Sequence, residues 1–172
     1  GTMALPHLSS RALAGLAQNH PQAWQHYLAR FKSSDYKTQK ALSYALKTVH
    51  DPKLIDQLIA ELANDKWDDT SRLLILDILA RLSHKEAEWD LIAWWGTRPT
   101  DHGPYYEGKT WEQTPKIIKA IETNFGKFKA SSQVDVIDQL ALNQINTSKL
   151  KLEGVDILFS AFDAQTPSTQ HI

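Results

Sequence analysis

Apolar residues recur at helical spacing along almost the whole chain. In residues 24–31, 42–49 and 55–62 they stand at positions i, i+3, i+4 and i+7. This spacing places the apolar side chains on one face of a helix, where they can be buried together. No stretch shows the convincing alternation of apolar and polar residues that is typical of a β-strand. The sequence therefore predicts an all-α protein.

Proline and short polar residues mark where these helices begin. Proline follows His20, Asp51 and Thr114, and it is favoured in the first turn because its missing N–H would have no partner there. The side chains of Asp51 and Thr114 can also accept hydrogen bonds from first-turn amides. Asp68 stands before a further helix and is expected to cap it. The motif 83–86, Ser-His-Lys-Glu, has the spacing of a capping box and predicts another helix start.

These boundaries predict a series of short helices joined by turns that are mostly two to five residues long. The expected helices cover residues 8–18, 21–32, 35–49, 52–64, 69–82, 84–95, 115–125, 131–145 and 151–164. Short turns force consecutive helices to lie antiparallel. Helix pairs begin near residues 35, 69 and 112, a spacing of roughly 34–43 residues that is typical of HEAT and armadillo repeats. We therefore expect a right-handed α-solenoid of HEAT/armadillo-like antiparallel pairs with about 8–9 helices. A compact helical bundle is the alternative.

The helix expected over residues 69–82 differs from the others because it is apolar on nearly all its faces. Its large apolar residues are Leu73, Leu74, Ile75, Leu76, Ile78, Leu79 and Leu82. A helix of this kind has to be buried on several sides. We expect it to be central, with helix pairs on both sides.

Composition excludes several classes of function. The net charge of −1 gives no basic field for nucleic acid, so no nucleic-acid partner is expected. The absence of cysteine excludes disulfides, thiolate zinc sites and a c-type haem attachment within this chain. No apolar run approaches the ~20 residues of a membrane span, so membrane insertion is not expected. Residues 1–3 look like a cloning remnant, and residues 4–172 are expected to form one helical-repeat domain.

The helical pattern stops between Trp95 and Thr114. Residues 96–113 contain three of the seven glycines and two of the seven prolines. A structureless loop of this length is uncommon in a compact domain, and aromatic residues in and beside it offer large surfaces to bury. We therefore expect one long ordered loop that packs onto the helices.

The aromatic-rich stretch carries three motifs: Trp94-Trp95-Gly96-Thr97-Arg98-Pro99, Gly103-Pro104-Tyr105-Tyr106 and Trp111-Glu112. Together they resemble a signature in the HEAT-like helical region of large modular membrane-bound dehydrogenases of planctomycetes, verrucomicrobia and Bacteroidetes. The resemblance is sharp over residues 89–118 and general elsewhere. It implies a periplasmic or extracellular protein in which the helical region docks dehydrogenase-like and cytochrome c-like modules of the same parent chain. This chain has neither a propeller nor haem-binding cysteines, so no cofactor is expected in it.

The candidate binding residues all belong to this stretch. They are Trp94, Trp95, Arg98, Asp101, His102, Tyr105, Tyr106 and Trp111. The Arg98 guanidinium is suited to a carboxylate, a haem propionate or a partner's acidic side chain. We favour the structural interpretation, in which Arg98 holds the loop by bonding helix-end carbonyls or by pairing with Asp101 or Glu112. The aromatic residues suit sugar stacking or a protein interface, or else the core beneath the loop, which we favour for Trp95 and Trp111.

Nothing in the sequence predicts a catalytic site. His102 has no second histidine at i+3 or i+4, so no metal site is expected. Motifs for a nucleophilic serine or a phosphate-binding loop are absent. The leading hypothesis is a non-catalytic scaffold or docking module, excised from a larger exported redox protein. A small-ligand or carbohydrate-binding domain that uses the loop is the alternative, and an enzyme with an unfamiliar loop site is a third hypothesis.

Overall fold

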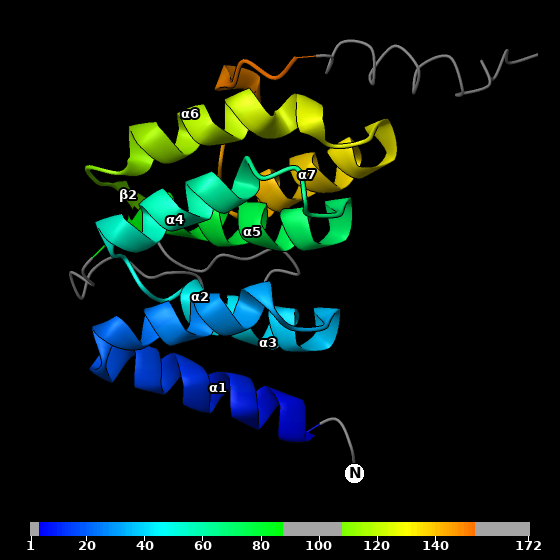
Figure 1. Cartoon of the computed structure of the whole chain (residues 1–172). Helices are drawn as coiled ribbons and strands as arrows, with labels where there is room; N and C mark the ends of the chain where they lie inside the picture. Colours follow the sequence, from blue (N-terminus) through cyan, green and yellow to red (C-terminus); the bar gives the residue numbers. More distant parts are fainter. Residues whose placement is uncertain (1–3, 88–107, 154–172) are drawn as a thin grey trace, which may run out of the picture.

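The computed structural model describes residues 4–87 and 108–153, and this part of the chain is mostly helical (Figure 1). Its α-helices are α1 (Ala4–Asn19), α2 (Trp24–Lys32), α3 (Tyr36–Leu46), α4 (Pro52–Leu62), α5 (Asp69–Leu82), α6 (Thr114–Asn124) and α7 (Ala130–Leu142). Short 3-10 turns are η1 (Pro21–Ala23), η2 (Phe125–Lys127) and η3 (Thr147–Lys149). Two strands, β1 (His84–Glu86) and β2 (Gly108–Thr110), form an antiparallel pair. The predicted all-α character is confirmed, apart from this strand pair.

The strand pair corrects two predictions. A helix was expected to start at residue 84, but residues 84–86 form β1. The expected capping box does not form, because the Ser83 hydroxyl donates to the Ala80 carbonyl in the preceding helix. The loop expected over 96–113 includes strand β2 at residues 108–110. Residues 88–107 lie outside the described part of the chain. So do residues 154–164 of the last expected helix, whose first residues, 151–153, are not helical.

The helices follow chain order from α1 at one end to α6 and α7 at the other (Figure 1). Helix α1 packs on α3, α2 packs on α3, and α4 packs on α5. Helix α3 contacts α5, and α5 contacts α7. Helix α4 also contacts α6. Helix α5 therefore touches α3, α4, α6 and α7, as its apolar sequence predicts.

The core is centred on α5. Six of its large apolar side chains are buried and one, Leu73, is half-buried; the buried ones are Leu74, Ile75, Leu76, Ile78, Leu79 and Leu82. The neighbouring helices contribute buried residues such as Phe31, Leu58, Ile121 and Val136. Each such side chain contributes about 1.5–3 kcal/mol when it is removed from water. Burial on several sides makes α5 the common support of the other helices.

The predicted helix starts are confirmed at Asp51 and Asp68, whose side chains accept hydrogen bonds from amides of α4 and α5. Asp51 also accepts a hydrogen bond from the Trp24 indole, 3.2 Å away, which ties α2 to the start of α4. Thr114 differs from the prediction because it is the first residue of α6 and does not cap it. Its hydroxyl donates to the Ser83 carbonyl and accepts from the Trp111 amide.

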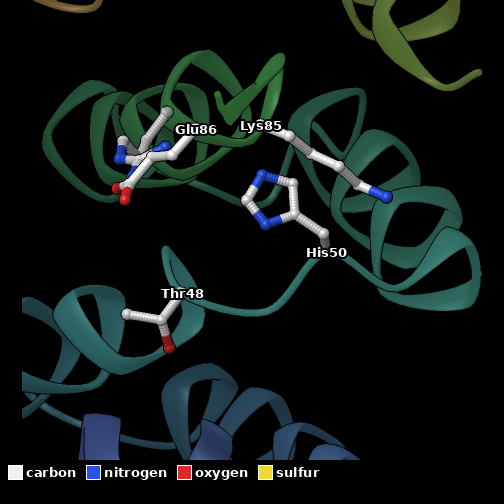
Figure 2. Close-up of a pocket in the computed structure, with 5 residues that line it drawn as sticks. Thr48, His50, Lys85 and Glu86 are labelled. Carbon is white, nitrogen blue, oxygen red and sulfur yellow. The ribbon is translucent and has the colours of Figure 1, made fainter. Parts of the chain in front are cut away.

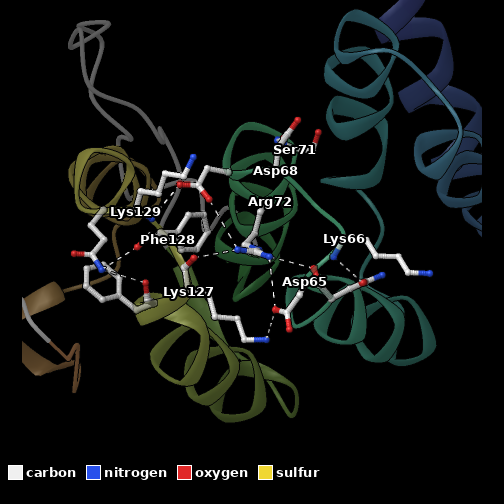
Figure 3. Close-up of polar contacts among 12 residues, drawn as sticks. Asp65, Lys66, Asp68, Ser71, Arg72, Lys127, Phe128 and Lys129 are labelled. Atoms are coloured by element: carbon white, nitrogen blue, oxygen red, sulfur yellow. Dashed lines mark hydrogen bonds and ion pairs between the residues drawn. The ribbon is translucent and has the colours of Figure 1, made fainter.

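A buried arginine joins the α4–α5 turn to the α6–α7 turn (Figure 3). The Arg72 side chain is only 6% exposed, and it donates to the carbonyls of Lys127 and Asn64 at 3.1 and 3.2 Å. Its guanidinium lies 5.9 Å from the centre of the Phe128 ring. Asp69 accepts a hydrogen bond from the amide of the residue that follows Phe128. These bonds fix the position of α6 and α7 relative to α5.

None of the helices in residues 4–87 and 108–153 is long and apolar enough to cross a membrane.

Replacing Arg72 with methionine should lower the free energy of unfolding by about 2–4 kcal/mol, because the carbonyls of Lys127 and Asn64 lose a charged, buried donor while the side-chain volume is largely kept. Urea denaturation measures this loss. Arg30→Met, at an exposed position on α2, is the matched control and should change stability by about 0.5 kcal/mol or less. Equal effects of the two substitutions would show that Arg72 does not join the two turns.

Candidate functional site

The strand pair connects the end of α5 to the start of α6. In its register, His84 lies opposite Thr110, Lys85 opposite Lys109 and Glu86 opposite Gly108. This pairing brings Glu86 and Gly108, which flank residues 87–107, next to each other. The strand pair therefore flanks residues 88–107, which carry seven of the eight candidate binding residues.

Two side chains near the start of α6 hold the strand pair against the end of α5. The Trp111 indole donates to the Leu82 carbonyl at 2.9 Å, and the Thr114 hydroxyl donates to the Ser83 carbonyl. Trp111 is half-buried and packs against the core. The prediction that Trp111 packs against the helices is confirmed.

A cavity of about 330 Å³ lies beside β1, between the α5–β1 region and the α3–α4 connection. It is lined by Thr48, His50, Arg81, Lys85 and Glu86 (Figure 2). Figure 2 shows the His50 ring between the Lys85 and Glu86 side chains, with Thr48 on the opposite wall. Polar and charged side chains line this cavity, so it is suited to a polar ligand.

The orientation of the His50 ring is fixed on two sides. Its Nε2 lies 2.9 Å from the His84 carbonyl, and a carbonyl can only accept, so Nε2 carries the proton. The ring also packs edge-to-face on Trp111, with 5.4 Å between the ring centres. In the neutral ring Nδ1 is therefore a hydrogen-bond acceptor.

Two cationic side chains, Arg81 and Lys85, line the same cavity as this imidazole. Arg81 pairs with the Glu86 carboxylate, and the Lys85 ammonium lies 4.5 Å from the centre of the Trp111 ring. Burial lowers the pKa of His50, and the positive charges of Arg81 and Lys85 lower it further. The hydrogen bond to the His84 carbonyl and the charge of Glu86 act in the opposite direction but do not outweigh these effects. His50 is therefore uncharged at neutral pH.

The pKa of His84, at the start of β1, is also lowered. Burial lowers the pKa of its imidazole, and the charge of Arg81 lowers it further. Its Nδ1 lies 2.8 Å from the Ser83 hydroxyl. A Cβ atom added at Gly108 would lie 3.2 Å from His84 Cβ and Cγ, so a side chain there would fit only if His84 moved by a few tenths of an ångström.

A second polar cavity, of about 320 Å³, is lined by Lys32, Glu61, Asn64, Lys66 and Trp67. Burial acts to raise the pKa of Glu61, but hydrogen bonds from Lys32 and Trp67 outweigh it, so the pKa is lowered. Three donors thus already occupy the Glu61 carboxylate. The polar side chains that line this cavity therefore bind one another, which indicates a structural role for them.

Of the eight predicted site residues, the structure describes only Trp111. The positions of Trp94, Trp95, Arg98, Asp101, His102, Tyr105 and Tyr106 lie outside the described residues. Sequence reasoning did not identify the cavity, because His50 and β1 are more than 30 residues apart and share no helical spacing. Within residues 4–87 and 108–153, no group of three or more His, Asp or Glu side chains is arranged to hold a metal ion.

Comparison of the chain with protein-family models, with curated proteins and with solved structures finds no match.

The lowered pKa of His50 predicts that the chain becomes less stable as the pH is lowered. Below about pH 6.5, His50 binds a proton in the unfolded chain, whereas in the folded chain it stays uncharged until the pH reaches its lowered pKa. The free energy of unfolding therefore decreases as the pH falls from about 6.5 toward the pKa of the folded state. Urea denaturation between pH 8 and pH 5 should show a shallower decline for His50→Gln than for the unchanged chain. His26→Gln, at an exposed position on α2, should leave the slope as it is. A slope that His50→Gln does not alter would contradict this electrostatic description.

The close approach of Gly108 to His84 predicts that Gly108→Ala destabilises the chain by about 1 kcal/mol, because the added methyl group presses on the His84 ring base. Thermal unfolding measures the effect. The matched control is Gly126→Ala, where a Cβ meets nothing within 4 Å and no loss is expected. Unchanged stability in Gly108→Ala would mean that the strand pair is looser than described.

Proposed function

We propose that this chain is a non-catalytic helical-repeat module that docks other protein modules. The proposed architecture is a right-handed α-solenoid of HEAT/armadillo-like helix pairs. The order of contacts supports it. Helix α3 packs on α5 and α5 packs on α7, while α2 packs on α3 and α4 packs on α5. Such stacks bury a continuous core and leave extended faces for partners.

The observation that carries the proposal is the anchored strand pair. Its strands flank residues 87–107, and Trp111 and Thr114 hold it to the end of α5. That segment carries Trp94, Trp95 and Arg98, and tryptophan and arginine are the residue types that contribute most to protein interfaces. A fixed base reduces the entropy that such a segment loses on binding. We therefore place the docking edge at this end of the helix pairs.

The proposed partners are the dehydrogenase-like and cytochrome c-like modules that the sequence resemblance implies, in the same exported parent chain. A periplasmic or extracellular location follows from the same resemblance. The alternative is a small-ligand or carbohydrate-binding domain, and the polar cavity beside β1 favours it.

The test is a binding measurement between this chain and the separately purified modules encoded on either side of it in its gene. Isothermal titration calorimetry should show saturable binding to at least one of them. Arg98→Ala or Trp94→Ala should weaken that binding about tenfold or more, equivalent to about 1.4 kcal/mol. Lys37→Ala, on the exposed surface of α3, is the control and should bind as the unchanged chain does.

Two results would contradict the proposal. One is a parent gene that encodes neither a dehydrogenase-like nor a cytochrome-like module. The other is binding that Arg98→Ala and Trp94→Ala leave as strong as Lys37→Ala does.

A further inference from the structure

We propose that the cavity lined by Thr48, His50, Arg81, Lys85 and Glu86 binds a small anion, the carboxylate or phosphate group of a metabolite-sized molecule. This site lies beside the strand pair, next to the docking edge, but its argument does not depend on the docking proposal. Its volume of about 330 Å³ suits a small molecule rather than a peptide segment.

The first argument is that two lysines of the strand pair, in the described part of the chain, have no carboxylate partner. The register of the strand pair sets Lys85 directly opposite Lys109. Like charges that face each other across two strands destabilise the pair. In the described part of the chain, neither lysine forms an ion pair with a carboxylate. A bound anion would relieve this repulsion.

The second argument is the balance of charge among the lining residues. Among the lining residues in the described part of the chain, Arg81 and Lys85 are cationic and Glu86 is acidic. The Glu86 carboxylate already pairs with Arg81, so it does not neutralise Lys85. The pKa of both His50 and His84 is lowered by burial and, further, by the charge of Arg81, which is consistent with a positive potential at this place.

The third argument is the fixed chemistry of the His50 ring. Its Nε2 is held by the His84 carbonyl, so in the neutral ring Nδ1 can accept a hydrogen bond. The Lys85 ammonium beside this acceptor matches a ligand that carries both an anionic group and a hydroxyl group. The edge-to-face contact with Trp111 keeps the ring in place before any ligand arrives.

The experiment follows the histidine side-chain resonances by ¹H–¹³C NMR on the full chain, at constant ionic strength maintained with chloride. One arm adds inorganic phosphate and the other adds acetate. In at least one arm the His50 signal should shift saturably and its pKa should rise by about half a unit or more, because a nearby anion favours the imidazolium. A response to phosphate alone identifies a phosphate-bearing ligand, and a response to acetate identifies a carboxylate. Exposed His26 serves as the internal reference.

Substitutions at exposed lysines separate this site from general ion effects. Lys85→Met should weaken the apparent affinity about fivefold or more, whereas Lys85→Arg should retain it. Lys37→Met, on α3, is the matched control and should bind like the unchanged chain. The proposal is overturned if His50 responds no more than His26 in both arms, or if Lys85→Met and Lys37→Met respond alike.

Discussion

The packing of α5 on four sides is the constraint on which the rest of the structure depends. Its apolar residues cover nearly every face, so an arrangement that left more of this helix open to water would lose much of its apolar burial. Helices α3 and α4 cover it from the N-terminal half of the chain, and α6 and α7 cover it from the C-terminal half. Arg72, on the same helix, then ties the turns at its N-terminal end together through backbone carbonyls.

The other end of α5 supplies the candidate site. The last carbonyls of a helix have no partner within the helix. Here the carbonyls of Leu82 and Ser83 accept hydrogen bonds from the side chains of Trp111 and Thr114. The same end leads directly into β1, whose His84 carbonyl orients His50. The strand pair, the cavity beside it and the base of residues 87–107 thus all depend on where α5 ends.

The sequence predicted the parts of this fold that local chemistry determines. Apolar spacing located the helices, and the side chains of Asp51 and Asp68 marked two of their starts correctly. The apolar faces of residues 69–82 predicted the central position of α5. Trp111 was expected to pack against the helices because a large aromatic side chain gains most from burial.

The errors arose where distant residues determine local structure. Residues 83–86 have the spacing of a capping box, but β1 forms there because β2, more than 20 residues later, supplies a pairing partner. The cavity could not be predicted for the same reason, since His50 reaches β1 only after α4 and α5 fold back on each other. Sequence spacing carries no information about such contacts, and a strand of three residues is too short to show alternation.

Native-state hydrogen exchange measures the central position of α5 most directly. The amides of residues 75–79 should be the most protected in the chain, and they should exchange only through global unfolding. The amides of α1 and α7, which are packed on fewer sides, should exchange earlier through partial opening. Protection in α1 or α7 that equals or exceeds that of α5 would contradict the account, because the outer helices would then be stable without the helix that is described as their support.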